Sequence, residues 1–524
     1  MRFFLYYQPK VDNRKKVCYE VGMGENTTVN QTVISLPLHG RRKIFGTEDV
    51  ITKDNVIDVV NNVLTYHLLN LAEEEYLYWY RRGLQPILKR RREVRPELTK
   101  HVVVNNANQV VTFKNGYFMT APASYSARNE EDTELVKRFN DYCIAAGKQI
   151  VDNEIIDWFH TTGLGALYIE PGESERQPFK VYSLDPRSAC CAYSYRPGEE
   201  RVLGMNVVVQ GEKVLFDVFT KERKFTLMGG MTGVTTTING QPMPLIGTAT
   251  DLIAESPNVL GIIPIIEYQY DINRMCAFET AMPICDEINE MQSRLAEGIE
   301  GNIQQLAVAW NCNFDEGTTA NKIRERGMLV LRSTGDNKAD FKLIESNLSQ
   351  AETQKNIDAL YEQLLDKTGL PSISRNEGGS SDNGSAVYLK SGYTIADTNR
   401  RNTEDFWRKS DMEFRKAALQ ILKLRFADYT LEPEDFNLEI EPPTMSNLLV
   451  KTQAALNMRQ LGLAPQIWLE RSGISNDPIA DIELSKDYIY DFYNSQNGDE
   501  ETPSEGEALN DDRQVEELSS MNLD

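Results

Sequence analysis

Apolar residues recur at helical spacing in several long stretches of the chain. In 52–82 the stripe consists of Val56, Val60, Val63 and Leu64. Further stripes predict helices over 278–301 and 349–368, because residues three and four apart share one face of a helix. A fourth pattern runs from Tyr393 to about Ala427 without Gly or Pro and would span roughly 50 Å. These three later stripes are formed by Ile284, Ile288, Met291, Leu295 and Ile299, by Ile357, Leu360 and Leu364, and by Phe406, Trp407, Phe414, Leu419, Leu422 and Leu424.

Alternation with a period of two predicts strands elsewhere. Residues 1–45 indicate a hairpin and a further strand, and 179–270 indicate short strands joined by Gly-rich turns. Gly163 and Gly165 lack a third glycine and follow a helix, so they favour a helix cap and turn over a dinucleotide site. Other strands are expected at 166–169, 305–310, 328–332 and 436–440, a turn with a short strand at 105–117, and further helices at 132–160, 444–461 and 464–472. The pattern as a whole predicts an α+β protein.

Two polar segments interrupt these patterns. Residues 372–385 are mostly small and polar and lie between two predicted long helices, where a loop is usually either functional or a disordered linker. Residues 494–524 hold ten acidic residues against Arg513 and no aromatic residue. That composition predicts a disordered acidic tail.

Composition places the chain among soluble globular proteins. It has 524 residues, 41% hydrophobic and 26% charged, with a net charge of −22. The longest apolar run, 260–266, is too short to span a bilayer, and the first residues lack a signal-peptide pattern. We therefore expect a cytoplasmic, non-membrane protein whose overall field does not attract nucleic acid. The seven cysteines lack CxxC spacing, which favours reduced, buried thiols over a metal or redox site.

The most basic part of the chain is 81–95. It contains Arg81, Arg82, Lys89, Arg90, Arg91, Arg92 and Arg95 against Glu93 alone. This patch has two interpretations, a contact for phosphate or a partner, and a solvated face of an acidic protein.

Motifs for enzymatic chemistry are missing. Gly147-Lys148 lacks the upstream glycine and the following hydroxyl residue of a phosphate-binding loop, and HExxH, GxSxG and EF-hand patterns do not occur. The four histidines are scattered, and acidic residues form no local cluster typical of a metal site. The sequence therefore favours a structural or interaction protein without catalytic residues, metal or cofactor.

Several segments, taken in order, resemble the portal proteins of long, non-contractile-tailed bacteriophages. No single motif is specific, but the order is collinear over 73–482. Residues 1–45 do not fit the pattern, and Gly392 departs from it by delaying the long helix. The resembling segments are EEYLYWYRRGLQPIL (74–88), VVVNNANQVVTFKNGYFMTAP (102–122), GLGALYIEPGE (163–173), FKVYSLDPRS (179–188), the stretch 258–310, LIESNLSQ…GLPSIS (343–374), DNGSAVYLKS (382–391) and EDFNLEIEPP…PIADI (434–482).

The resemblance implies a portal-type fold divided into named parts. It implies a mixed α/β wing, a two-helix stem, a small β-containing clip, a long wing helix and a helical crown. The expected boundaries are 1–265 for the wing, 266–303 and 346–371 for the stem helices, 304–345 for the clip, 372–385 for the tunnel loop, 386–434 for the long wing helix, 435–492 for the crown and 493–524 for the disordered tail.

The resemblance also implies a function. The chain would form a homo-oligomeric ring, a dodecamer, at one vertex of the capsid of the virion, after assembly in the host cytoplasm. Double-stranded DNA would pass through it during packaging and ejection. Its partners would be the terminase, the major capsid and scaffolding proteins and a head–tail connector, with no membrane.

Two groups of residues are the expected contacts. The clip would use Lys322, Arg324 and Arg326 toward its partners. The tunnel loop would contact DNA through Ser374, Arg375, Asn376, Glu377, Gly378, Gly379, Ser380, Ser381, Asp382, Asn383, Gly384 and Ser385. The alternatives are a nucleic-acid-processing packaging enzyme, distinguished by nucleotide hydrolysis, and a non-ring structural adaptor, distinguished by oligomeric mass.

Overall fold

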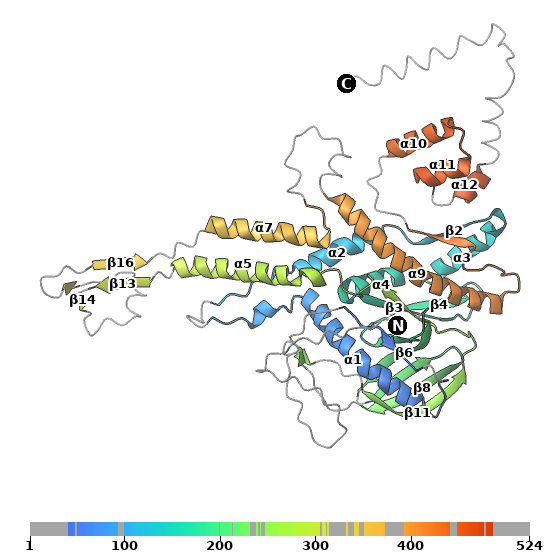
Figure 1. The fold of residues 1–524 in the computed structure, drawn as a ribbon, viewed down its shortest axis with the longest axis horizontal. Coiled ribbons are helices and arrows are strands. Elements are labelled where there is room, and N and C mark those ends of the chain that lie inside the picture. The colour runs from blue at the N-terminus through green and yellow to red at the C-terminus, as the bar shows by residue number, and fades with distance from the viewer. Residues whose placement is uncertain are drawn as a thin grey trace, which may run out of the picture. The chain divides into compact units, whose positions relative to one another are not determined.

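A computed structural model describes most of the chain between Gly40 and Ser485 (Figure 1). The chain divides into two units, 1–37 and 38–524, and every described residue belongs to the second. Helices and sheets are mixed, which confirms the predicted α+β class. The described residues are 40–47, 50–92, 99–198, 200–211, 213–230, 237–238, 241–242, 247–303, 306–310, 312–313, 332–333, 340–344, 350–372, 392–440, 448–475 and 478–485.

The largest hydrophobic core surrounds helix α9, Tyr393–Arg425. Trp407 and Phe414 of α9 are fully buried, as its apolar stripe predicts. Around them lie a three-stranded antiparallel sheet of order β12-β3-β4, the pair β17-β2 and two helices. These elements are β12 (Ile265–Gln269), β3 (Leu164–Pro171), β4 (Phe179–Leu184), β17 (Phe436–Glu439), β2 (Ser124–Ala127), α3 (Thr133–Ala145) and α4 (Lys148–Thr162).

A second core lies between α1, Val56–Arg81, and a six-stranded sheet of order β1-β5-β6-β7-β8-β11. The predicted stripe of α1 is buried here in full. The pair β1-β5 is parallel and the others are antiparallel. The strands are β1 (Ile44–Phe45), β5 (Ala189–Tyr193), β6 (Arg201–Gln210), β7 (Lys213–Phe219), β8 (Arg223–Gly230) and β11 (Thr248–Pro257), with a separate pair β9 (Thr237–Ile238) and β10 (Gln241–Pro242).

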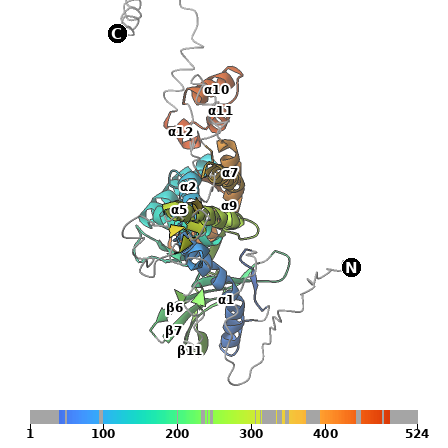
Figure 2. The same ribbon diagram turned by 90° about the vertical axis from the view of Figure 1, so that its left-hand side faces the viewer.

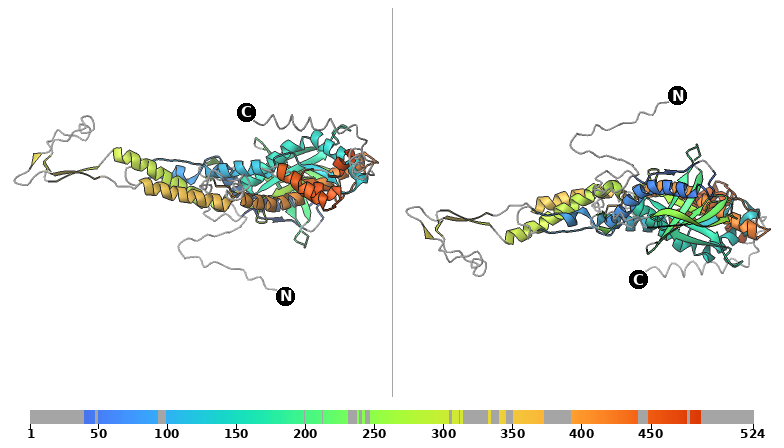
Figure 3. Two further views of the ribbon diagram at one scale, coloured as in Figure 1. Left: turned by 90° about the horizontal axis from the view of Figure 1, so that it is seen from above. Right: turned by 90° about the horizontal axis from the view of Figure 1, so that it is seen from below.

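A third core joins α2, α5 and α7 to the end of α1. Helices α5 and α7 run side by side, and a paired-strand segment connects them along the chain (Figures 1 and 3). In that segment β13 pairs with β16 and β14 with β15. The elements are α2 (Asn106–Phe118), α5 (Met282–Ile303), α7 (Gln350–Thr368), β13 (Leu306–Trp310), β14 (Cys312–Asn313), β15 (Arg332–Ser333), β16 (Asp340–Ile344) and the short helices η1 (Pro86–Lys89), η3 (Glu130–Asp132) and η4 (Glu279–Ala281).

Three short helices complete the described chain. They are α10 (Leu448–Gln460), α11 (Pro465–Ser472) and α12 (Pro478–Leu484). None of the helices in the described ranges has the length and hydrophobicity needed to cross a bilayer.

Two sequence predictions are corrected, and two elements were not predicted. Residues 105–117 form helix α2 rather than a turn and strand, because Ala107, Val110 and Val111 are buried on one helical face against α1 and α5. The helix expected over 132–160 is two helices, broken at Gly147, whose φ of +70° lies in the left-handed region. The strand partner of β13 is β16, which the sequence pattern did not predict, and α12 was also missed. The hairpin expected within 1–45 falls largely outside the described residues.

Candidate functional site

The sequence-predicted contact residues fall outside the described residues. Lys322, Arg324 and Arg326 lie between β14 and β15, and the loop residues 374–385 lie between α7 and α9. The structure therefore tests neither group directly. It does describe the helices and strands that precede and follow them, and those elements carry the site geometry.

Helices α5 and α7 form one side of this geometry. Ile288 of α5 and Ile357 and Leu364 of α7 are buried against each other's helices, and Leu360 and Met291 are partly buried beside them. This agrees with the apolar stripes predicted from the sequence. The two helices begin and end the paired-strand segment, so their packing fixes where that segment starts and returns.

A second face of α5 is polar and buried. Asn289, Ser293 and Glu297 follow one another at four-residue spacing and are between 0 and 4% exposed. Each accepts a hydrogen bond from a backbone N–H of the segment 99–104, which precedes α2 and which we call the strap. The pairs are Val104 N–H to Asn289 Oδ1 at 2.9 Å, Val102 N–H to Ser293 Oγ at 3.0 Å and Lys100 N–H to Glu297 Oε1 at 3.0 Å.

The regular spacing of these bonds has a geometric cause. Four helical residues advance about 6.0 Å, and two extended residues advance about 6.6 Å. Alternate N–H groups of the strap can therefore meet every fourth residue of α5. The acceptors are visible in the sequence, because Asn289, Ser293 and Glu297 form a polar stripe beside the apolar one. The stripe alone does not identify the segment that it binds.

Arginines of the basic patch reinforce the same helix. Arg90 binds Glu297 at 2.6 Å and Glu290 at 2.9 Å, and Arg92 lies 3.6 Å from Glu297. Burial raises the pKa of Glu297, but hydrogen bonds from Arg90 and from the Lys100 amide outweigh burial, so its pKa lies below the usual range. Arg90 and Arg92 of the basic patch are thus neither free phosphate contacts nor a solvated face. Their ion pairs hold the chain that precedes the strap against α5.

A glycine lies on each side of the predicted loop, one after α7 and one before α9. Gly369 follows α7 with φ +70°, and a Cβ there would clash with the side-chain amide of Asn399 on α9. Leu370 N–H returns to Leu365 O at 2.9 Å, and Gly392, with φ +84°, precedes α9. The segment 373–391 therefore leaves α7 at a turn that lies against Asn399 of α9 and rejoins the described chain at the start of α9.

Beneath α9 lies a buried group of charges. Asp411 accepts hydrogen bonds from Tyr125 at 2.8 Å and from Arg415 at 3.1 Å, and Lys148 binds Asp152 at 2.7 Å and lies 3.8 Å from Asp411. Burial lowers the pKa of Lys148, but the two carboxylates outweigh it and raise the pKa overall. Arg415 also donates to the backbone oxygens of Pro433 and Phe436 at 2.7 Å each. The group locks α9 to α4, β2 and the start of β17.

Another buried charge group joins α1 to η4, just before α5. Arg41 binds Glu279 at 2.8 Å, lies 3.3 Å from Glu73 and donates to Thr162 O at 2.7 Å. Its neighbour Glu74 is fully buried with one carboxylate oxygen unpaired, and burial raises the pKa of Glu74 to about 8.

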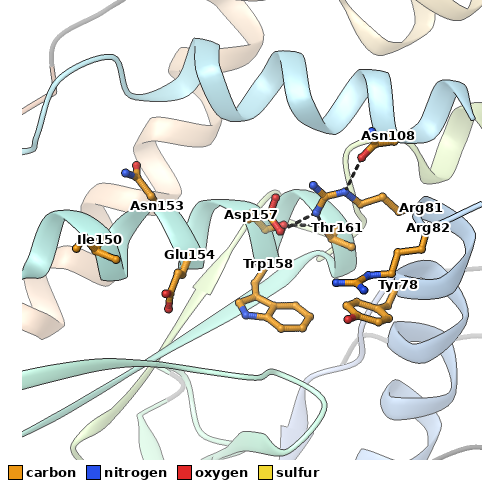
Figure 4. Close-up of a pocket in the computed structure, with 10 residues that line it drawn as sticks. All are labelled: Tyr78, Arg81, Arg82, Asn108, Ile150, Asn153, Glu154, Asp157, Trp158 and Thr161. Carbon is orange, nitrogen blue, oxygen red and sulfur yellow. Dashed lines mark hydrogen bonds and ion pairs between the residues drawn. The ribbon is translucent and has the colours of Figure 1, made fainter.

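The described surface contains a cavity of about 600 Å³ between α1, α2 and α4 (Figure 4). One wall is cationic and aromatic: the ring of Tyr78 stacks on Trp158 at 5.7 Å, and the guanidinium of Arg82 lies 4.4 Å from the Tyr78 ring centre. Arg81 crosses the cavity to Asp157 at 2.7 Å. The remaining lining residues are Asn108, Ile150, Asn153, Glu154 and Thr161.

Neither a metal site nor a nucleophile stands out in this geometry. The described residues contain no group of three or more His, Cys, Asp or Glu side chains placed to hold a metal ion. The five cysteines within the described ranges are buried free thiols, and burial raises their pKa values. The arrangement is one of helices held in fixed relation, which suits mechanical positioning.

Comparison with known proteins gives one family. A family model described as phage portal protein, SPP1 Gp6-like, matches residues 65–488, most of the chain. A search of curated proteins gave no match. The matched region includes α5, α7, α9, the strap and the cavity.

Proposed function

Because the chain belongs to the phage portal protein family, we propose that it is the subunit of a ring at one capsid vertex through which double-stranded DNA enters and leaves. Members of this family are structural components of the phage capsid and not catalysts. The proposed ring is a dodecamer, assembled in the host cytoplasm and retained in the virion. Its partners are the terminase, the major capsid and scaffolding proteins and a head–tail connector.

The parts of the proposed subunit follow the described elements. Helices α5 and α7 are the stem (266–303 and 346–371), β13 to β16 belong to the clip (304–345), and α9 is the long wing helix (386–434). The six-stranded and three-stranded sheets belong to the wing (1–265). Strand β17 pairs with β2 of the wing, so we place the crown after β17, in α10, α11 and α12 within 435–492. The acidic tail is 493–524.

The family match over 65–488 carries this proposal. The arrangement of α5, paired strands and α7 supports it, because two packed helices that lead to and from a strand segment can present that segment to a motor or connector. Net charge supports the role of a channel that does not grip DNA, because a chain of −22 offers few phosphate contacts that would stop movement.

The ring is tested by negative-stain images and sedimentation of the purified protein. We expect closed rings with a central hole and a mass of many subunits. A protein that stays monomeric at all concentrations would exclude the ring and favour a structural adaptor. Nucleotide hydrolysis that co-purifies with the protein and is lost on mutation of an acidic residue would instead favour a packaging enzyme.

The loop assignment is tested by replacing Gly378 and Gly379 with proline. Proline fixes φ and removes the freedom that glycine gives the backbone. We expect normal rings and capsids with little packaged DNA, measured by nuclease-protected DNA per capsid. The matched control replaces Gly498 and Gly506 of the acidic tail with proline, which makes the same change outside the loop. Full packaging by the proline variant would show that the loop does not act on DNA.

The clip assignment is tested with Lys322→Ala and Arg324→Ala together. We expect weaker binding to terminase or connector with an unchanged melting temperature, since exposed loop charges contribute little stability. Unchanged binding to both partners would mean that these charges only add solubility.

A further inference from the structure

Helix α1 exposes a face without charge. From 59 to 72 the sequence contains no Asp, Glu, Lys or Arg, although 26% of the chain is charged. Tyr66 is 56% exposed and Leu69 44% exposed on this stretch, while His67 points inward and is buried. We call the exposed set the α1 face, and it consists of Asn62, Thr65, Tyr66, Leu68 and Leu69.

The corner between α3 and α4 exposes a second such face. Its most exposed residues are Ile144 at 76% and Ile150 at 67%. The charges within this stretch, Lys148 and Asp152, are buried and bind each other, so none reaches the surface. We call the exposed set the α3–α4 face, and it consists of Ile144, Ala145, Gln149, Ile150 and Asn153.

The net charge of the chain favours a second copy of the same chain as the partner that covers these two faces. Two copies that each carry −22 repel one another wherever acidic surfaces meet, so close contact is least costly where both surfaces lack charge. Exposed Tyr, Leu and Ile at such places are typical of interface centres. The two faces themselves carry no exposed charge, and the charged residues that line the neighbouring cavity are two arginines and two acids, which offset each other: Arg81, Arg82, Glu154 and Asp157.

Shape favours one face against the other. The α3–α4 face is hollowed, because Ile150 and Asn153 form the rim of the 600 Å³ cavity whose wall is Tyr78 and Trp158 (Figure 4). The α1 face is a convex helix with Tyr66 as its most exposed large residue. An aromatic ring stacks well on Trp158 and Arg82, and a tyrosine hydroxyl can bond the carboxylates that also line the cavity.

We propose that the α1 face of one copy packs on the α3–α4 face of the next, with Tyr66 entering the cavity beside Ile150. In Figure 1, α3 lies to the right of α4 and α1 lies below α4, and Figure 2 shows α1 beside β6 and β7. A contact between two different faces is head-to-tail and closes into a ring when the rotation allows. The inference rests on the proposed ring and names the residues that would build it.

The test is to add one charge to each face separately. Leu69→Glu alters the α1 face, and Ile150→Glu alters the α3–α4 face. Each variant retains one intact face, so each alone should assemble at least about tenfold more weakly than the wild type. An equal mixture should form dimers through the single intact pair of faces, because that pair joins only one copy of each variant. Sedimentation velocity of each variant and of the mixture measures this.

Three further variants distinguish the loss of the interface contact from a loss of folding. Val259→Glu is the matched control, because Val259 is 77% exposed and lies on neither face. Tyr66→Ala should weaken assembly, and Tyr66→Phe should retain most of it. Melting temperatures close to that of the wild type are expected for all, since every altered side chain is substantially exposed.

The outcomes distinguish the inference from the proposed function. If the wild type forms rings and all variants do so equally, the interface is wrong and the ring stands, with a different protein as the occupant of these faces. If only one of the two charge variants is impaired, the altered face packs on a surface other than the proposed one, and if both are impaired but the mixture does not dimerise, the two faces do not meet each other; either result makes the head-to-tail pairing wrong. If the wild type never associates, the proposed ring fails and the interface fails with it.

Discussion

Helices α9 and α5 are both amphipathic, yet they are held in different ways. Trp407 and Phe414 anchor α9 in an aromatic core, and buried hydrogen bonds of Asp411 and Arg415 tie the same helix to β2 and β17. Helix α5 has apolar contacts to α7 on one face and three directed hydrogen bonds to the strap on another. Hydrogen bonds depend on distance and angle, so they fix the rotation and axial position of a helix. Both helices therefore combine apolar burial with directed hydrogen bonds, but α9 bonds to side chains and carbonyls within its core, whereas α5 bonds to backbone N–H groups along the strap.

The largest effect is expected from Phe414→Ala. The aromatic side chain of Phe414 is fully buried in the core around α9, and truncation of a buried Phe costs about 3–5 kcal/mol. Urea unfolding measures the loss. Leu424→Ala on the same helix is the control, because Leu424 is 57% exposed and should change stability by less than about 0.5 kcal/mol. Equal effects of the two variants would show that α9 is not held by its core.

A smaller and more local effect is expected from Glu297→Ala. The change removes the acceptor for Arg90 and for the Lys100 amide and should cost about 2 kcal/mol. Amide hydrogen exchange should speed up at Lys100 and Val102 while α9 keeps its protection. Exposed Glu287 on the same helix provides the control, as Glu287→Ala. Unchanged exchange in the strap would contradict the idea that it is held through this carboxylate.

The pH dependence at Glu74 probes the junction between α1 and η4. Because the folded-state pKa is raised from 4.5 to about 8, the folded protein holds a proton that the unfolded chain releases. Stability should therefore be complete below pH 4.5 and fall as pH rises toward 8, by about 1.4 kcal/mol for each pH unit. The cause is burial first, and the neighbouring acids Asp185, Glu267 and Glu73 add to it against Arg41.

Glu74→Gln should remove most of this slope, measured as melting temperature between pH 5 and pH 8. Glu154→Gln is the matched control, because Glu154 is exposed on α4. A wild type and Glu74→Gln variant with parallel pH profiles would mean that Glu74 does not titrate in this range.

Sequence patterns predicted α1, α5, α7 and α9 because their apolar stripes were long. They failed at α2, where Val110 and Val111 next to Asn-rich turn residues favoured a strand. Burial of Ala107 and Val110 against α1 and α5 outweighs that local preference, and such tertiary contacts are not visible in one window of sequence.

The candidate site was predicted in part. The order of segments was enough to indicate the family, and the predicted helices on both sides of 304–345 are present. The strap was not predicted, because its donors are backbone N–H groups, which every residue except proline carries, so the polar stripe of acceptors on α5 does not reveal which segment it binds. The cavity was also missed, since Tyr78, Arg82 and Trp158 meet across nearly eighty residues of sequence.

The pairing between strap and helix combines two unequal spacings, one along the strap and one along α5. Its two spacings differ by about 0.6 Å at every step, so the misfit grows to about 1.2 Å from Asn289 to Glu297. One more step would bring it to about 1.8 Å, beyond what hydrogen-bond distances tolerate. The sequence stops at the same point, because the next position on the stripe is Gly301, which has no acceptor. The hydrogen bonds between the strap and α5 therefore end at Glu297.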